Sequence, residues 1–183
     1  MKPENEMADK HKTLAEALLT QEASSTGEEL QERLDIIRHK LKFVENKPAI
    51  ACIEKLEPLT LAGHWVPEAI EVAGGIAVMA GPGEDSREVN WGQVSAGDPD
   101  IIVIAISGLS IEDTLREIAA FLQQPGFAQL KAVKNNRLYI ADGNRLYASG
   151  PGIVDAIEMY AEIIHPKQFI FGFEGDGWMR FGV

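Results

Sequence analysis

The run IIVIAI at residues 101–106 limits the folds open to this chain more than any other stretch, because it is apolar at every position. Such a strand has to be covered on both faces, which is typical of the parallel sheets of α/β proteins. The runs AIACIE at 49–54 and RLYIA at 137–141 are predicted as further strands. Helical patterns separate these strands. We therefore predict an α/β fold with a mostly parallel sheet and helices on both faces, a three-layer lobe of Rossmann-like type.

A long amphipathic helix of linker type is predicted to precede this lobe, within residues 27–46. Its apolar positions recur at spacings of four, three and four, at Leu30, Leu34, Ile37 and Leu41. Thr26 and Glu29 have the spacing of a capping box, and Glu29 with Arg33 has that of an exposed ion pair.

Shorter helical patterns follow at 65–73, 91–97, 111–124 and 152–165, and Ser110 is predicted to cap the third of them. The chain thus divides into four parts: a mobile or marginally helical segment (1–26), the long helix (27–46), the α/β lobe (47–166) and an aromatic tail (167–183). The tail, which contains FIFGFEGDGWMRF, is predicted to cover a sheet edge or a helix.

Composition excludes several classes of function. A formal net charge of −11 argues against a nucleic-acid partner, and the single cysteine, Cys52, rules out an internal disulfide and is predicted to be a buried small hydrophobe. The chain has no apolar run long enough to insert into a membrane. Its start has no signal-peptide pattern, so a cytoplasmic location is expected for the chain as written.

No enzyme is predicted. The sequence contains neither a phosphate-binding loop nor a nucleophile elbow, and its four histidines are scattered. Glu54 and Glu57 could serve as an acid/base pair, and this remains a weaker third hypothesis.

Ligands of open α/β sheets bind beyond the carboxyl ends of the strands. The loops expected there are 54–65, 80–91, 107–110 and 142–150, and they carry aromatic side chains suited to flat apolar ligands.

Three blocks carry a resemblance to a known family: CIEKLEPLTLAGHWVPEAIEVAGG (52–75), SREVNWGQVSAGDPDIIVIA (86–105) and LKAVKNNRLYIADGN (130–144). In this order they resemble the C-terminal lobe of the periplasmic substrate-binding proteins of ABC importers for cobalamin and ferric siderophores, over residues 27–166. The resemblance implies two α/β lobes joined by a long helix, with the ligand in the cleft between them. The N-terminal lobe of the family is not recognisable in this sequence.

Seven residues are candidates for ligand binding, through this resemblance or through their place in the cleft-side loops: Glu57, His64, Trp65, Ser86, Arg87, Trp91 and Tyr147. Trp65 would stack on a corrinoid ring, and His64 would hydrogen-bond its side chains or approach cobalt. The structural alternative is a helix entry at Gly63-His64, with Trp65 packed under the neighbouring loop.

The chain departs from the family pattern in several places. Lys55 replaces an aromatic residue, and the stretch LYASGPGI (146–153) lacks two arginines of the family's block. Gly92 replaces an acid near the surface that docks on the permease, which weakens the expectation of permease docking.

Two hypotheses follow. The first is a non-enzymatic binding lobe of an ABC importer, with cobalamin or a ferric chelate as ligand, no intrinsic cofactor, and a periplasmic location if the chain is cut from a longer precursor; a separate chain could then supply the other lobe. The second is a stand-alone cytoplasmic interaction protein of the same fold that has lost ligand binding and forms a homodimer.

Overall fold

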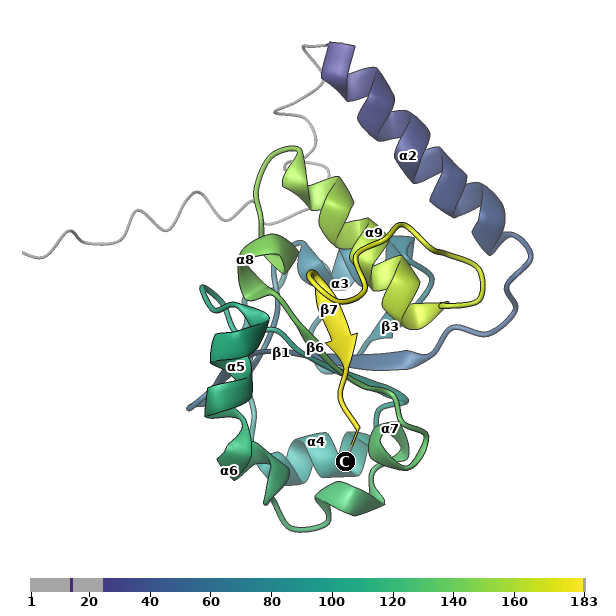
Figure 1. The fold of residues 1–183 in the computed structure, drawn as a ribbon. Helices are drawn as coiled ribbons and strands as arrows, with labels where there is room; N and C mark the ends of the chain where they lie inside the picture. Colours follow the sequence, from purple (N-terminus) through teal and green to yellow (C-terminus); the bar gives the residue numbers. More distant parts are fainter. Residues whose placement is uncertain (1–13, 15–24, 183) are drawn as a thin grey trace, which may run out of the picture.

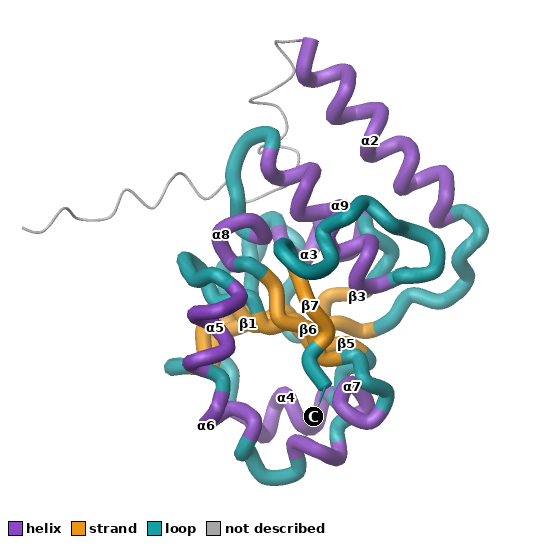
Figure 2. Tube along the Cα trace, viewed as in Figure 1, coloured by secondary structure: helices purple, strands orange, loops and turns teal. Residues whose placement is uncertain are grey.

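The computed structural model describes Leu14 and residues 25–182, and its centre is a sheet of seven strands with helices on both sides (Figures 1 and 2). The strand order is β4-β2-β1-β5-β6-β7, and β3 also pairs with β1. The strands are β1 (Ala49–Leu56), β2 (Leu59–Leu61), β3 (Ile76–Ala77), β4 (Arg87–Glu88), β5 (Ile101–Ile104), β6 (Leu138–Ala141) and β7 (Trp178–Arg180).

The central strands are parallel. β1 pairs in parallel with β5 and β3, and β5 pairs in parallel with β6. β2, β4 and β7 join antiparallel toward the two edges of the sheet. All four residues of β5 are buried, as expected for a strand covered on both faces. The predicted fold class is confirmed.

Helices cover each face of the sheet and close a separate apolar core on each side. One face carries α2 (Ser25–Leu41), α3 (Val66–Val72), α8 (Gly143–Leu146) and α9 (Gly152–Ile164). The other carries α4 (Trp91–Gly97), α5 (Ile111–Glu117), α6 (Ala119–Leu122), the 3-10 helix η1 (Phe127–Gln129) and α7 (Lys131–Lys134). The helix predicted over 111–124 is therefore two helices, which meet at Ile118, although Ser110 does cap the first, its hydroxyl oxygen accepting the amide of Asp113 at 3.2 Å.

The long helix differs from its prediction at both ends. It spans Ser25–Leu41 rather than 27–46, so Thr26 lies inside the first turn and is not the cap. After Leu41 the backbone bonds tighten to a three-residue spacing, as in the bond from the Val44 amide to the Leu41 carbonyl at 3.0 Å. Phe43 is 75% exposed, and Glu45, Asn46 and Lys47 are polar, so the chain beyond Leu41 buries little of the apolar surface that would favour a longer helix.

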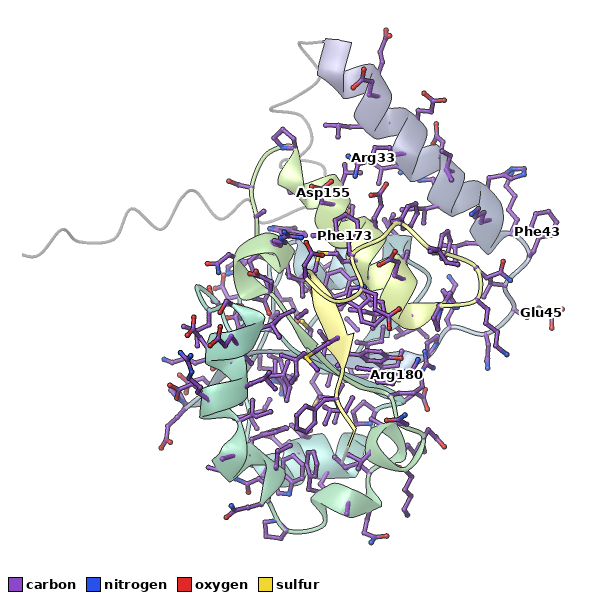
Figure 3. All side chains as sticks on the ribbon, in the orientation of Figure 1. Arg33, Phe43, Glu45, Asp155, Phe173 and Arg180 are labelled. Atoms are coloured by element: carbon purple, nitrogen blue, oxygen red, sulfur yellow. The ribbon has the colours of Figure 1, made fainter. Side chains whose placement is uncertain are left out.

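Arg33 makes a different ion pair from the predicted one. Its guanidinium binds Glu158 through Nε at 2.9 Å and Nη2 at 2.6 Å, and it also contacts Asp155, so it ties α2 to α9 (Figure 3). The Glu158 side chain is only 7% exposed, and a buried carboxylate needs a partner more than the exposed Glu29 does.

The aromatic tail covers both a sheet edge and a helix. β7 pairs with β6 as the edge strand. The Glu162 carboxylate on α9 accepts hydrogen bonds from the amides of Phe171, Gly172 and Phe173 and from Trp178 Nε1. No strand was predicted in the tail.

The marginal helix predicted within 1–26 lies mostly outside the described residues. Leu14 is described: its side chain is buried against α2 and α3, and its amide donates to Glu68 Oε2 at 2.7 Å. Within the described part of the chain, no helix combines the length and the hydropathy needed to cross a membrane.

Candidate functional site

A small cavity lies at the carboxyl ends of β1 and β5, the position that the sequence predicts for a ligand. Its volume is about 60 Å³. Six of the lining residues come from three of the four predicted loops, and the seventh is Val66 of α3: Glu54, Gly63, His64, Trp65, Val66, Ser107 and Tyr147. The Ser107 amide donates to the Glu54 carbonyl at 3.0 Å, so the pairing of the two strands continues to the cavity.

The fourth predicted loop, 80–91, packs against Gly63 and His64, which line the cavity. Gly63 packs so closely against it that a Cβ atom would come within 2.5 Å of the Asp85 carbonyl carbon, which explains glycine at this position. The His64 amide donates to the Glu84 carbonyl at 2.5 Å, and the Gly63 amide donates to Ser86 Oγ at 3.3 Å. Ser86 therefore positions the loop that lines the cavity.

His64 has an unusual conformation. Its φ of 56° places it in the left-handed region, which costs a residue other than glycine about 1–2 kcal/mol. Its Nδ1 is buried without a hydrogen-bond partner among the described residues, and Asp85 Oδ1 lies 3.8 Å away, beyond hydrogen-bond distance. Such strained, unsatisfied residues gather at functional sites.

Trp65 is 7% exposed and belongs to the core, and it also lines the cavity. It stands at the start of α3, where no side chain caps the helix.

Tyr147 lines the cavity, and its hydroxyl contacts a buried thiol. The hydroxyl lies 3.5 Å from Cys52 Sγ, and the Tyr160 hydroxyl lies 3.3 Å from the same sulfur. Burial raises the pKa of the Cys52 thiol to about 11, and it raises the pKa values of both tyrosines well above their usual range. These three groups are therefore uncharged at neutral pH, and the prediction that Cys52 is buried is confirmed.

Four predicted residues do not line the cavity: Ser86, which supports it as described above, and Glu57, Arg87 and Trp91. Glu57 is exposed in the turn between β1 and β2, so Glu54 and Glu57 do not share a site as an acid/base pair. Arg87 is exposed on β4 and donates to the Met79 carbonyl at 3.2 Å. Trp91 belongs to the core on the other face, where its Nε1 donates to the Pro125 carbonyl at 2.8 Å.

Sequence reasoning missed the role of Glu54 and Ser107 as cavity walls. Glu54 directly follows Ile53, the last paired residue of β1, and Ser107 lies three residues after Ile104, the last paired residue of β5. No group of three or more histidine, cysteine, aspartate or glutamate side chains in the described part of the chain could hold a metal ion.

The three-layer fold with a cavity at its strand ends defines an α/β lobe whose loops can bind a ligand. The sequence pattern of the periplasmic binding protein family matches residues 3–144, and the chain therefore belongs to this family. The match begins well before residue 27, where the resemblance noted above begins, so it includes most of the segment 1–26.

The solved structures that are at least 25% identical to this chain include the following two. A periplasmic binding protein from Veillonella parvula is 25% identical with a TM-score of 0.66, over 78% of this chain and 50% of that one. Helicobacter pylori CeuE with Ni(II) bound is 26% identical with a TM-score of 0.64, over 87% of this chain and 54% of that one.

The fold is also shared by the vitamin B12 binding protein BtuF of Vibrio cholerae. It is 18% identical with a TM-score of 0.62, over 84% of this chain and 62% of that one. This chain thus spans about half to two thirds of the length of these structures. No curated protein sequence matches it.

Proposed function

We propose that this chain is a solute-binding lobe of an ABC-type importer, and that its ligand is cobalamin or a related metal chelate. The observation that carries the proposal is the cavity at the strand ends, where His64, Trp65 and Tyr147 meet Glu54 in a chain of the periplasmic binding protein family. The names of similar proteins support the ligand class, since BtuF is a vitamin B12 binding protein and CeuE was solved with Ni(II).

The size of the cavity supports a role as one wall of a larger site. A volume of 60 Å³ equals the share of about two water molecules in the liquid, whereas sites for drug-sized ligands enclose about 300–1,000 Å³. A corrinoid would thus touch this wall with one edge and need a second lobe for its remaining contacts. This lobe alone should bind weakly, because half of the contacts and the preorganised cleft are missing.

The charge of the cavity favours one kind of chelate. Among the described residues, Glu54 is the carboxylate in its wall and no lysine or arginine lines it, and Asp85 lies next to His64. A polyanionic ferric siderophore would be repelled by this wall, while a neutral or cationic metal complex would not. We therefore place cobalamins ahead of ferric siderophores.

The test is a calorimetric titration of the chain with aquocobalamin, cyanocobalamin and a ferric tris-catecholate. We expect weak saturable binding of the cobalamins and none of the catecholate. Glu54→Gln should weaken binding of the cationic aquocobalamin about threefold to tenfold, while Glu57→Gln, which changes an exposed carboxylate outside the cavity, is the matched control.

No heat with any ligand up to about millimolar concentration would contradict binding by this lobe alone. The same titration repeated on a longer chain that carries a second lobe would then decide the proposal. Light scattering on the same samples tests the alternative, since a stable homodimer that binds no cobalamin would favour an interaction protein and tell against the importer role.

A further inference from the structure

We propose that a second site, at the opposite end of the sheet, binds a small organic anion: a carboxylate or phosphate attached to an apolar body. The site is an open groove of about 810 Å³, which lies within the range of small-molecule sites. Its walls are the turn after α2 (43–46), the segment before β6 (135–137) with Tyr139, the end of α9 with its following turn (164–168), and Arg180 of β7 (Figure 3).

The groove is far from the cavity described above. β6 starts beside the groove at Leu138, and the parallel strands β1 and β5 end at the cavity. Parallel strands have all their amino ends on one side and all their carboxyl ends on the other. The two sites therefore lie at opposite ends of the strands. The proposal for the groove is therefore independent of the proposed cargo.

Three cations line this groove in a chain whose net charge is −11: Arg137, Lys167 and Arg180. Glu45 is the one carboxylate among the lining residues. In the described part of the chain, salt bridges to carboxylates are made by other lysines and arginines, namely Arg33, Arg38, Arg116, Lys131 and Arg145. The three cations of the groove thus form no salt bridge to a carboxylate of the described residues.

Both arginines are held in place by contacts that leave most of their donors free. Arg137 Nη2 donates to the Ile164 carbonyl at 2.7 Å, and the Arg180 guanidinium lies over the Tyr139 ring at 5.7 Å from its centroid. A guanidinium has five N–H donors, so each arginine can still bind an anion through a forked pair. Fixed side chains lose little entropy on binding, which favours affinity.

The apolar part of the ligand follows from the other wall. Phe43 is 75% exposed and lines the groove next to Val44, and Pro166 lines it as well. An exposed phenylalanine beside cations suits a ligand with a ring or an aliphatic chain joined to its anionic group. His165, whose ring nitrogen Nε2 contacts the Gly74 carbonyl at 2.9 Å, adds a polar edge to the same wall.

The experiment uses phenyl phosphate as the probe, with inorganic phosphate and phenol as its two halves, and follows backbone amide shifts by NMR. We expect phenyl phosphate to shift amides in 43–46, 135–137, 165–168 and at Arg180, and to bind at least fivefold more tightly than either half. Arg180→Gln and Lys167→Gln should each weaken binding about tenfold, whereas Lys55→Gln, which removes an exposed cation outside the groove, should have no effect.

Several outcomes would overturn the proposal. These are no shifts up to about 10 mM phenyl phosphate, shifts that spread over the whole chain, or equal affinities in the folded Arg180→Gln and wild-type proteins. Binding to vesicles with anionic lipids in the absence of phenyl phosphate binding would also overturn it, and would instead assign the surface to a membrane. The NMR spectrum of each variant reports its folding, so a misfolded variant is not mistaken for a lost site.

Discussion

Removing the Glu162 carboxylate should detach the aromatic tail from the lobe. Glu162 is 3% exposed and accepts four hydrogen bonds, among them those from the Gly172 amide at 2.6 Å and Trp178 Nε1 at 2.8 Å. Each of its oxygens serves two donors, since Oε1 accepts from Phe171 and Gly172, and Oε2 from Phe173 and Trp178. The carboxylate therefore fixes the tail and the edge strand β7 together.

The expected magnitude follows from this count. A buried donor left without a partner costs about 1–3 kcal/mol. In Glu162→Gln the amide oxygen can serve two of the four donors while the NH₂ group faces the other two, so we expect a loss of about 3 kcal/mol in the free energy of unfolding. For a chain of this length that lowers the Tm by about 6–12 °C. Glu162→Ala should cost about 6 kcal/mol at the same cost per donor, because all four donors lose their partner.

The assay is urea and thermal unfolding, with hydrogen exchange at the amides of Phe171, Gly172 and Phe173 as a local readout. These amides should exchange faster in Glu162→Gln than in wild type, ahead of the amides of the central strand β5. Glu174→Gln is the matched control, because it changes an exposed carboxylate in the same tail, and it should stay within about 0.5 kcal/mol of wild type. A Glu162→Gln protein as stable as the control, with unchanged exchange in the tail, would refute the reasoning.

Three further predictions concern other buried groups. Arg33→Met should lower the free energy of unfolding, measured in urea, by about 1–3 kcal/mol, because it leaves the buried Glu158 without its partner. Arg38→Met breaks an exposed pair and should change this free energy by less than about 0.5 kcal/mol. Equal effects of the two substitutions would contradict a special role for the α2–α9 contact. Cys52 should react with an aromatic disulfide reagent at pH 8 at least a hundredfold more slowly in the native chain than in urea, since burial raises the pKa of its thiol to about 11; fast native labelling would show the thiol to be accessible. Burial lowers the pKa of His165 below its ordinary 6.5, so as the pH falls His165 is protonated in the unfolded chain before it is protonated in the folded chain. The free energy of unfolding should therefore fall as the pH drops below about 6.5. His165→Gln should make this free energy less dependent on pH between about pH 7 and 5, and an unchanged curve would contradict the prediction.

The accuracy of the sequence predictions varies with how local the determining interactions are. The strand pattern of 101–106 and the helix capped by Ser110 were predictable, because periodicity and capping are read from neighbouring residues. The capping box predicted at Thr26 was wrong, and one that was not predicted exists at Asn90, whose side chain and that of Gln93 bind each other's backbone amides at 2.9 Å. A residue can cap a helix only if the helix begins directly after it. Tertiary packing helps to decide where the helix begins, and the sequence alone does not give this residue.

The candidate site shows the same division. Its place at the carboxyl ends of the strands followed from the predicted parallel sheet, and three predicted loops do line the cavity. Which side chains enter it did not follow, because Trp91 turns into the opposite core and Arg87 stays exposed. Orientation depends on the faces of β4 and α4, which are set by partners distant in sequence.

The sequence by itself determined the α/β class, the order of the main strands and helices, and the edge of the sheet where a ligand site belongs, because these depend on local periodicity and on general rules of parallel sheets. Only the tertiary structure decided that Arg33 binds α9, that Glu162 fixes the tail as an edge strand, and that Arg137, Lys167 and Arg180 meet in one groove. Each of these contacts joins residues from separate elements; Glu162 of α9, for example, binds the tail that ends in β7. Their energy comes from burial and charge that exist only once the layers have packed.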